Sequence, residues 1–422
     1  MNLEPGWFLQ RIRRFPPAQV IHAGFSGGLD SHVLLHLLSR IKDQIPPVRA
    51  IHIHHGLLAE ADTWVSHCSE VCAALNIPLD VFHVDAQPKT GEGPEAGARQ
   101  ARYAAIANHM GQGESLLTAH HQDDQAETLL LQLFRGAGTA GLAAMPAWAP
   151  FAEGWHGRPL LELSRLELEE YAREQGLEWI EDPSNEDLRY RRNFIRQQLM
   201  PQIREHWPGI SQTLAAAAKL QAESLGLTDT LARLDLEEAQ GVTPTTLSVS
   251  ALKRLTGARQ RNLIRYWLKE KGLGMPGQRH LAEILKILES RADCEAKVSW
   301  KGCELHRYRD ELYAFSPQKP HDPALELSWQ PGQDIENPAT GEVLYWQSLL
   351  DMGIRLENPN QVLTLRFRSG GERIKLAPDR PHHKLKHLMQ EAGIPPWERD
   401  RIPLIYEGNR LLVVYGYWVN SE

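Results

Sequence analysis

Short apolar runs and longer amphipathic stretches alternate along the first half of the chain. An apolar run is typical of a strand buried on both faces, whereas a surface helix is apolar along one stripe only. Their regular alternation predicts an α/β fold, a parallel doubly wound sheet with helices on both faces. We expect strands at Val20–Phe25, Val48–His54, Leu79–Val84 and Ser115–Ala119, and helices at His32–Ile41, Asp62–Leu75, Glu95–His109, Arg165–Gln175 and Arg191–His206.

The pattern becomes mainly helical after Pro208. The Ala- and Leu-rich stretch Gln212–Leu234 predicts a long connecting helix, and Leu252–Lys271 and Gln278–Ser290 predict further helices. Short alternating runs, a cluster of prolines and a final strand–helix–strand pattern follow. We expect an α/β domain at residues 1–208, a mainly helical domain at 209–320, a linker region at 321–360 and a small α+β domain at 361–422, with short strands near Ala296–Trp300 and Glu311–Phe315.

A glycine-rich segment, Ser26–Ser31, joins the first predicted strand to the first predicted helix. Glycines allow backbone N–H groups to approach phosphate oxygens, and the start of a helix favours an anion. The hydroxyls of Ser26 and Ser31 can add donors. A carboxylate at Asp30 would repel phosphates unless it holds a divalent cation such as Mg²⁺. The segment therefore predicts a phosphate site that uses a metal.

The motif differs from the common P-loop, because Asp30 stands where that motif has lysine, and no G-x-G-x-x-G occurs. A plain turn with a Ser or Asp helix cap is the alternative. Six specified positions between a strand and a helix favour function. The pattern resembles the pyrophosphate loop (PP-loop) of the N-type ATP pyrophosphatases, which cleave ATP between the α and β phosphates. This resemblance implies ATP and Mg²⁺ as cofactors, Asp30 as the Mg²⁺ ligand, and an ATP site made of Ser26, Gly27, Gly28, Leu29, Asp30 and Ser31.

An acidic pair follows the fourth predicted strand. Asp124 and Glu127 are three residues apart, so they share one face of the predicted helix. Two carboxylates there can hold a metal or a cationic substrate. The alternative is an acidic first turn that complements the helix dipole. Their occurrence together with Ser26–Ser31 favours a functional role.

Two arginine pairs are further candidates. Arg99 and Arg102 lie with Glu95 on one stripe of a predicted helix, where a solvated salt-bridged face is the alternative. Arg192 and Arg196 lie one helical turn apart after the turn-forming segment Glu181–Asn185, and can meet a phosphate or a carboxylate.

Composition limits the class of protein. With 422 residues the chain is long enough for two or three domains. Four cysteines are too few for a disulfide scaffold, which favours a cytoplasmic location. We recognise no signal peptide and no apolar run of about 18 residues, so we expect no membrane segment. The net charge of −7 does not indicate nucleic-acid binding, although net charge does not exclude a local basic patch.

Taken together, the motifs resemble those of the tRNA(Ile)-lysidine synthetase family over essentially the whole chain. The matching segments include Ser26–Ser31, Glu95–Tyr103, His120–Thr128 and Glu181–Arg196, and a final domain with Arg368–Arg373, Lys384–Leu388 and Ile394–Arg399. His54–Leu57 also matches, but Leu58 departs from the Arg or polar residue of many members, so we assign no substrate contact there.

This resemblance implies a ligase that joins L-lysine to C2 of the wobble cytidine (position 34) of tRNA(Ile) with a CAU anticodon. ATP would adenylate the cytidine, and AMP and pyrophosphate would be released. It implies Asp30, Asp124 and Glu127 as catalytic residues, with Asp124 and Glu127 binding lysine. Arg99, Arg102, Arg192 and Arg196 are candidates for contacts to substrate or phosphate. A homodimer is possible.

The last domain carries a basic run that we expect to contact tRNA, although Glu372 and Asp379 dilute its charge and an ordinary solvated surface is the alternative. The candidates are Arg368, Arg373, Lys375, Lys384 and Lys386.

Three other functions compete with this reading. A tRNA-thiolating PP-loop enzyme is the first, but it needs a reactive cysteine pair, and Cys68 and Cys72 lie on a predicted scaffold helix at an unsuitable spacing. A small-molecule amide ligase would not require the two additional domains. A non-enzymatic RNA-binding protein would not need Asp30, Asp124 and Glu127 intact.

Overall fold

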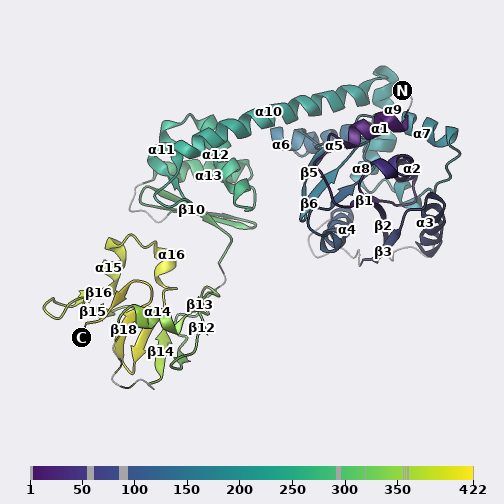
Figure 1. Cartoon of the computed structure of the whole chain (residues 1–422). Coiled ribbons are helices and arrows are strands. Elements are labelled where there is room, and N and C mark those ends of the chain that lie inside the picture. Colours follow the sequence, from purple (N-terminus) through teal and green to yellow (C-terminus); the bar gives the residue numbers. More distant parts are fainter. Residues whose placement is uncertain are drawn as a thin grey trace. The chain divides into compact units, whose positions relative to one another are not determined.

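The computed structural model describes residues 3–54, 61–84, 94–290, 296–318, 320–354, 356, 358 and 361–421 (Figure 1). The chain divides into two compact units, residues 1–230 and 231–422. Within the described residues, no helix combines the length and the apolar character that crossing a membrane would require.

The first unit is built on a six-stranded sheet with the order β3-β2-β1-β4-β6-β5. Five strands run parallel and only β5 is antiparallel, against β6. The four predicted strands are present, whereas the β5–β6 hairpin was not predicted. The strands are β1 (Ile21–Gly24), β2 (Val48–His54), β3 (Leu79–His83), β4 (Ser115–Leu117), β5 (Trp148–Phe151) and β6 (Gly154–Gly157).

Successive residues of single strands enter different apolar clusters, which shows that both faces of the sheet are covered. Ala50 and Leu117 belong to a cluster with the helix α2, while their neighbours Ile51 and Leu116 pack with Ile106 of α4. The predicted doubly wound α/β fold is therefore confirmed. The helices of this unit are α1 (Pro5–Ile12), α2 (Leu29–Ile41), α3 (Ala61–Leu75), α4 (Pro94–His109), α5 (Gln122–Phe134), α6 (Thr139–Leu142), α7 (Arg165–Glu174), α8 (Arg191–Phe194), α9 (Met200–His206) and the start of α10 (Ile210–Ala239).

The predicted helix Arg191–His206 is interrupted. A π-helical turn, Ile195–Leu199, separates α8 from α9. Pro201 follows this turn and has no N–H group to donate, which disturbs the regular pattern of helical hydrogen bonds. Such turns are frequent at functional sites.

The second unit begins within α10 and continues with a helical region that also carries a four-stranded antiparallel sheet, β7-β10-β9-β8. The helices pack on this sheet around a core that includes Trp267, Leu281 and Leu305. The strand β9 was not predicted. The elements are β7 (Leu247–Ser248), α11 (Val249–Arg254), α12 (Gly257–Glu270), α13 (Gln278–Glu289), β8 (Ala296–Trp300), β9 (Cys303–Tyr308) and β10 (Glu311–Phe315).

The end of the chain forms a five-stranded antiparallel sheet, β11-β14-β17-β18-β19. Residues 321–360, expected to be a linker, contain β11, β12, β13 and α14, and β11 pairs with β14. The sheet thus recruits a strand from before residue 361. The elements are β11 (Leu327–Trp329), β12 (Ile335–Glu336), β13 (Val343–Leu344), α14 (Trp346–Asp351), β14 (Leu363–Arg366), β15 (Arg373–Ile374), β16 (His383–Lys384), α15 (Leu385–Glu391), α16 (Pro396–Arg399), β17 (Leu404–Glu407), β18 (Arg410–Val414) and β19 (Trp418–Val419).

Candidate active site at the carboxyl edge of the sheet

The glycine-rich loop and the acidic helix meet because β1 and β4 are neighbours in the sheet. The loop leaves the carboxyl end of β1, and α5 begins five residues after β4 ends. In open parallel sheets this edge is where ligands bind. The topology therefore brings two sequence motifs almost 100 residues apart to one place.

The conformation of the loop depends on the backbone dihedral angle of Gly27 and on close packing around this residue. Gly27 has φ of +82°, which side chains rarely adopt, and a Cβ there would lie 3.2 Å from the Sγ of Cys68. The carbonyl of Gly27 accepts a hydrogen bond from the N–H of Ile180 at 3.0 Å. Cys68 is thus a buried packing residue beneath the loop.

Ser31 organises the turn that leads into α2. Its hydroxyl donates to the carbonyl of Gly28 at 2.8 Å, and accepts from the N–H of Ser26 at 3.2 Å. Gly28 caps the helix without a side chain. The first turn of α2 therefore keeps backbone donors for an anion, as a phosphate site requires.

Asp30 lies in the first turn of α2 and faces α5. Its Oδ2 is 3.6 Å from Nε2 of His121 and 4.0 Å from Nη1 of Arg165. Its Oδ1 is buried and has no hydrogen-bond partner among the described residues. A buried carboxylate oxygen without a donor fits the ligand chemistry of Mg²⁺.

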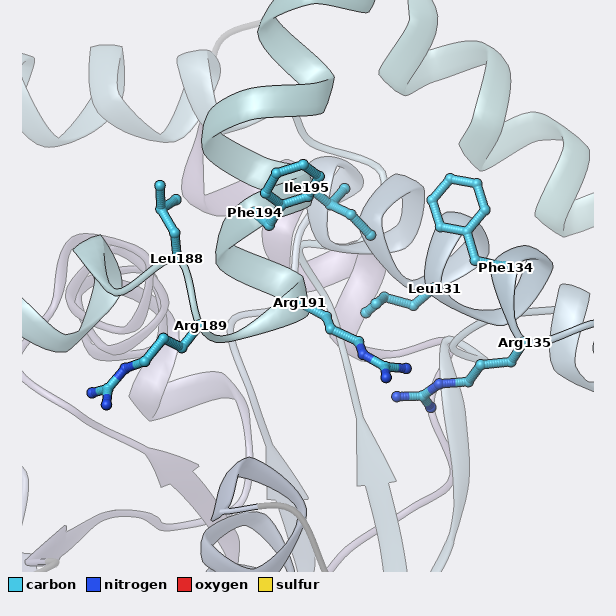
Figure 2. A pocket seen from close by; sticks show the side chains of 8 residues that line it. All are labelled: Leu131, Phe134, Arg135, Leu188, Arg189, Arg191, Phe194 and Ile195. Carbon is cyan, nitrogen blue, oxygen red and sulfur yellow. The ribbon is translucent and has the colours of Figure 1, made fainter.

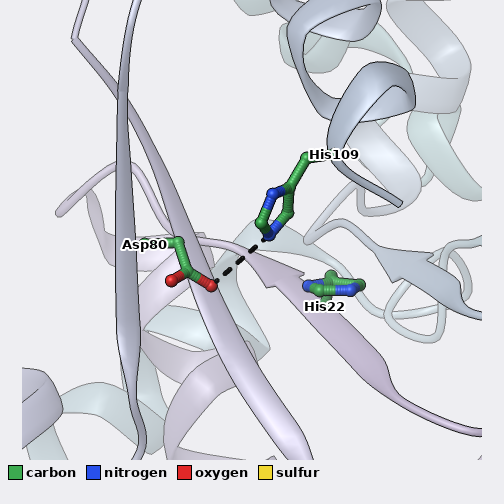
Figure 3. Close-up of side chains that lie close together, drawn as sticks. All are labelled: His22, Asp80 and His109. Atoms are coloured by element: carbon green, nitrogen blue, oxygen red, sulfur yellow. Dashed lines mark ion pairs between the residues drawn. The ribbon is translucent and has the colours of Figure 1, made fainter. Parts of the chain in front are cut away.

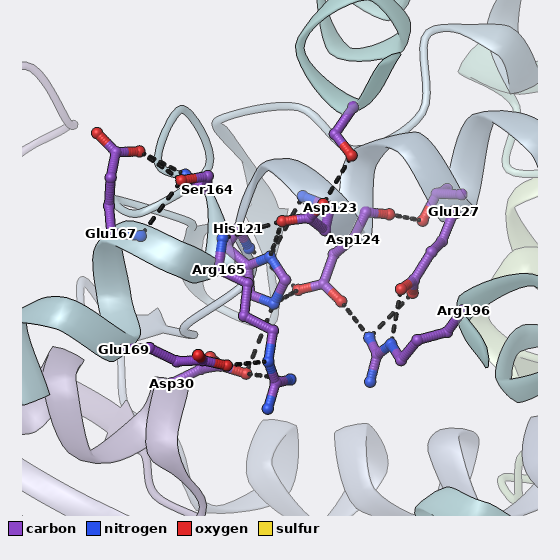
Figure 4. Close-up of polar contacts among 12 residues, drawn as sticks. Asp30, His121, Asp123, Asp124, Glu127, Ser164, Arg165, Glu167, Glu169 and Arg196 are labelled. Atoms are coloured by element: carbon purple, nitrogen blue, oxygen red, sulfur yellow. Dashed lines mark hydrogen bonds and ion pairs between the residues drawn. The ribbon is translucent and has the colours of Figure 1, made fainter. Parts of the chain in front are cut away.

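Four charged side chains form a compact cluster beside Asp30, and Figure 4 shows three of them, Asp124, Glu127 and Arg196. Arg192 donates to Asp124 and Glu127 at 2.9 Å each, and Arg196 donates to Glu127 at 2.6 Å and to Asp124 at 2.9 Å. The Glu127 side chain is only 3% exposed. Two carboxylates and two guanidinium groups thus neutralise one another, and the predicted arginine pair meets carboxylates.

His121 joins Asp30 to this cluster. Its Nε2 lies 3.5 Å from Oδ2 of Asp124 and its Nδ1 accepts from the N–H of Asp123, which caps α5. Burial alone would lower the pKa of His121, but Asp124 and Asp30 raise it above the ordinary value. Burial would raise the pKa of Asp124, but His121 and Arg192 hold it well below its usual range. Because Nδ1 accepts a hydrogen bond, the proton of the ring lies on Nε2, which faces both carboxylates.

Several supporting residues were not assigned from the sequence. Asp123 accepts from the Arg165 N–H at 2.9 Å and from the Ser211 hydroxyl at 2.7 Å, and it also pairs with Arg204. These contacts tie α5 to α7, α9 and α10. The adjacent acidic residues at 123 and 124 were visible in the sequence, but their partners come from distant segments.

A chain of hydrogen-bonded polar groups runs along the end of β4. Arg158 can only donate, so its bond to Nδ1 of His156, at 3.0 Å, leaves the proton of that ring on Nε2. His156 then donates to the Thr118 hydroxyl, which donates to Nδ1 of His120, each at 2.7 Å. Burial lowers the pKa of His156 to about 2 and that of His120 to about 3. Both rings are therefore neutral near pH 7.

The other predicted arginines lie outside the acidic cluster. Arg99 stacks its guanidinium on the ring of Tyr103, 4.9 Å from the centroid, and Arg102 is exposed on the same helix, α4. His55–Leu58 and the side chain of Glu95 lie outside the described residues.

The predicted basic run of the last domain divides into two groups. Arg368 is paired with Asp400 at 3.1 Å. Arg373 and Lys384 face each other in the β15–β16 hairpin, and both are exposed. Like charges placed opposite each other destabilise a hairpin unless an anion lies between them. Lys386 is also exposed, while Lys375 is partly buried.

A second group of potential metal ligands lies near the amino ends of β1 and β3 (Figure 3). It consists of His22, Asp80 and His109. His109 is 3.7 Å from Asp80, but Arg49 donates to both Asp80 oxygens, at 2.8 and 2.6 Å. His22 bonds to Glu114 at 2.8 Å. Because a guanidinium already occupies the carboxylate, we interpret this group as an ion-pair network that joins strands.

Comparison with known proteins supports the same assignment along the whole chain. Three family models match: "PP-loop domain" over residues 8–203, "TilS substrate binding domain" over 247–313 and "TilS substrate C-terminal domain" over 363–422. A tRNA(Ile)-lysidine synthase of Methylococcus capsulatus is 41% identical over 96% of this chain and 93% of its own length. One of Alkalilimnicola ehrlichii is 40% identical over 98% and 93%. The chain therefore belongs to the tRNA(Ile)-lysidine synthase family.

Proposed function

We propose that this chain joins L-lysine to C2 of cytidine 34 in a tRNA(Ile) with a CAU anticodon, in two steps. In the first, the cytidine O2 attacks the α-phosphorus of ATP and pyrophosphate leaves. In the second, the lysine amine attacks C2, and the C2–O2 bond breaks with release of AMP. The observation that supports this proposal best is the His121 bridge, because it joins the loop for ATP to the carboxylates for lysine.

The ATP half of the site uses the loop Ser26–Ser31. Its backbone donors and the start of α2 would bind the phosphates. Asp30 would hold Mg²⁺ through the oxygen that has no protein partner among the described residues. The metal would neutralise charge on the departing pyrophosphate. Arg165, 4.0 Å from Asp30, is placed to stabilise the same negative charge.

The lysine half uses Asp124 and Glu127, whose oxygens are already bonded to arginines. A lysine ammonium must therefore share them or displace a guanidinium. Arg196, with 31% of its side chain exposed, is better placed to turn away than Arg192, at 20%. We propose that a phosphate of ATP or tRNA attracts Arg196 and so frees the carboxylates for lysine. This exchange would make lysine binding depend on the other substrates.

The last domain would also bind the tRNA. Arg373 and Lys384 on the β15–β16 hairpin are the strongest phosphate contacts, with Lys386 next to them in α15. Arg368 serves structure through its pair with Asp400. Because the substrate is a tRNA we expect a cytoplasmic location. The homodimer stays a prediction, which sedimentation equilibrium would check.

The decisive experiment measures incorporation of radiolabelled lysine into a CAU-anticodon tRNA(Ile), with ATP and Mg²⁺, and release of AMP. We expect one lysine per tRNA, and none when cytidine 34 is replaced by uridine. Absence of incorporation would refute the proposal. Thiolation of the tRNA that is lost in a variant without cysteines would establish the competing function instead.

A further inference from the structure

A pocket of about 250 Å³ lies at the end of α5 (Figure 2). It is formed by the end of α5 and by residues between Leu188 and Ile195, which lead through α8 into the π-helical turn. The helix α5 supplies Asp124 and Glu127, while α8 and the turn supply the paired arginines. Leu131 lies one helical turn beyond Glu127, and Arg191 directly precedes Arg192. The pocket is therefore about one helical turn from the carboxylates proposed to bind lysine.

One part of the pocket presents apolar side chains to solvent. Phe134 is 64% exposed, Phe194 51% and Leu188 44%. Large apolar residues gathered around a hollow differ from scattered exposed ones, because together they offer a contact surface for a flat ligand. An aromatic face accepts an unstacked nucleobase of any identity.

Another part of the pocket carries positively charged side chains. Arg135 and Arg191 line the pocket, and neither guanidinium group makes a hydrogen bond or ion pair within the described residues. Figure 2 shows both side chains on the same side of the pocket. The neighbouring Arg189 differs, since it is paired with Asp187 at 2.7 Å. Two unpaired guanidinium groups at one opening are suited to bind a phosphate, which accepts donors from both.

We propose that this pocket binds a nucleotide next to the modified cytidine in the single-stranded anticodon loop. Phe194 and Leu188, with Phe134, receive its base, and Arg135 and Arg191 hold its phosphate. The inference rests on the proposed function, since it takes the anticodon loop as the substrate. Binding the neighbour would pull it out of the stack and leave the cytidine free to enter the active site. The pocket then positions the RNA without taking part in bond formation.

The test compares two variants with matched controls. Phe194→Ala removes the stacking face, and Arg135→Gln combined with Arg191→Gln removes the phosphate contact. Leu166→Ala and Arg173→Gln are controls on α7, because these residues are also exposed and lie in the same unit. The affinity of each protein for an anticodon stem-loop that carries 2-aminopurine beside cytidine 34 is measured over a range of salt concentrations. Thermal unfolding confirms that each variant is folded.

We expect the Phe194→Ala variant to bind about 10-fold more weakly and to lose the change in 2-aminopurine fluorescence. The double arginine variant should lower the slope of log affinity against log salt by about 0.7 for each lost phosphate contact. In lysine incorporation both should raise the KM for RNA and leave kcat nearly unchanged. A merely structural role would not alter the salt slope.

The inference is overturned if the variants match the controls in affinity, fluorescence and salt slope while the wild type modifies the RNA. If the wild type binds the stem-loop but incorporates no lysine, the proposed function fails, and the binding measurements still decide the pocket. The two failures are therefore distinguishable.

Discussion

His121 and Asp30 approach within 3.6 Å at the carboxyl ends of the strands, although they are 91 positions apart in the chain. The same imidazole nitrogen is 3.5 Å from Asp124. One buried ring thus connects the loop proposed to bind ATP to the carboxylates proposed to bind lysine, and its Nε2 lies between carboxylates of both. We expect this ring to keep the two halves of the site in register.

Replacing His121 by Asn should separate the contacts of this ring with Asp30 and Asp124 from its role as helix cap. Asn is a good N-cap, so α5 should keep its start, while the ring nitrogen that lies between Asp30 and Asp124 is lost. We expect lysine incorporation to fall by about 10- to 100-fold, as for other residues that orient a metal ligand. His206→Asn, at an exposed position, is the control. Equal activity of the two variants would contradict the role assigned to His121.

Substitutions of Asp30 and Glu127 should impair different steps of the reaction. Asp30→Ala should abolish adenylation, measured as release of pyrophosphate in the presence of tRNA. Glu127→Ala should mainly raise the KM for lysine, by about 10-fold or more, because a charged hydrogen bond contributes about 1.5–3 kcal/mol. Since Glu127 also binds both arginines, the stability of the Glu127→Ala variant must be measured by urea unfolding. An unchanged dependence on lysine would show that Glu127 does not bind it.

The sequence predicts those parts of the fold that have regular local patterns. The strands Val48–His54 and Leu79–His83 follow directly from apolar runs. The β5–β6 hairpin does not, because Gly154–Gly157 lacks both an apolar run and alternation. The strand β11 lies among prolines and gains its identity only by pairing with β14. Local pattern cannot reveal pairing that comes from distant residues.

The candidate site divides in the same way. Gly27 and Asp30 belong to a contiguous motif, and so they were identified directly. His121 appeared in a motif, but its approach to Asp30 depends on β1 and β4 being neighbours. Arg165 could not be found, because its contact with Asp30 requires the packing of α7 against α2. The ion pairs of Arg192 with Asp124 and Glu127 likewise depend on tertiary packing.

The cysteines of α3 should be unreactive and dispensable for chemistry. Burial raises the pKa of the Cys68 and Cys72 thiols to about 12. Their contribution to stability is complete below the ordinary value near 9 and is lost as pH rises from there towards 12, because only the unfolded chain then releases the protons. We expect native protein at pH 8 to react with a thiol reagent at these positions only as fast as it unfolds.

The matching variant, Cys68→Ala with Cys72→Ala, should keep lysine incorporation. It should lose about 1–2 kcal/mol of stability through the small cavities left beneath the loop. Loss of activity in a variant that remains folded would favour the thiolating alternative. Rapid labelling of the native protein would contradict the burial of these thiols.

His156 should make the protein sensitive to acid. Its pKa is lowered to about 2 by burial, so it stays neutral when folded, whereas the unfolded chain takes up a proton below about pH 6.5. The stability from the neutral ring is therefore present above pH 6.5 and is lost as pH falls towards 2. Urea unfolding should show the wild type losing about 1.4 kcal/mol more per pH unit than His156→Gln between pH 6 and 4. The His206→Asn control should parallel the wild type, and parallel curves for His156→Gln would mean that the ring is protonated in the folded protein.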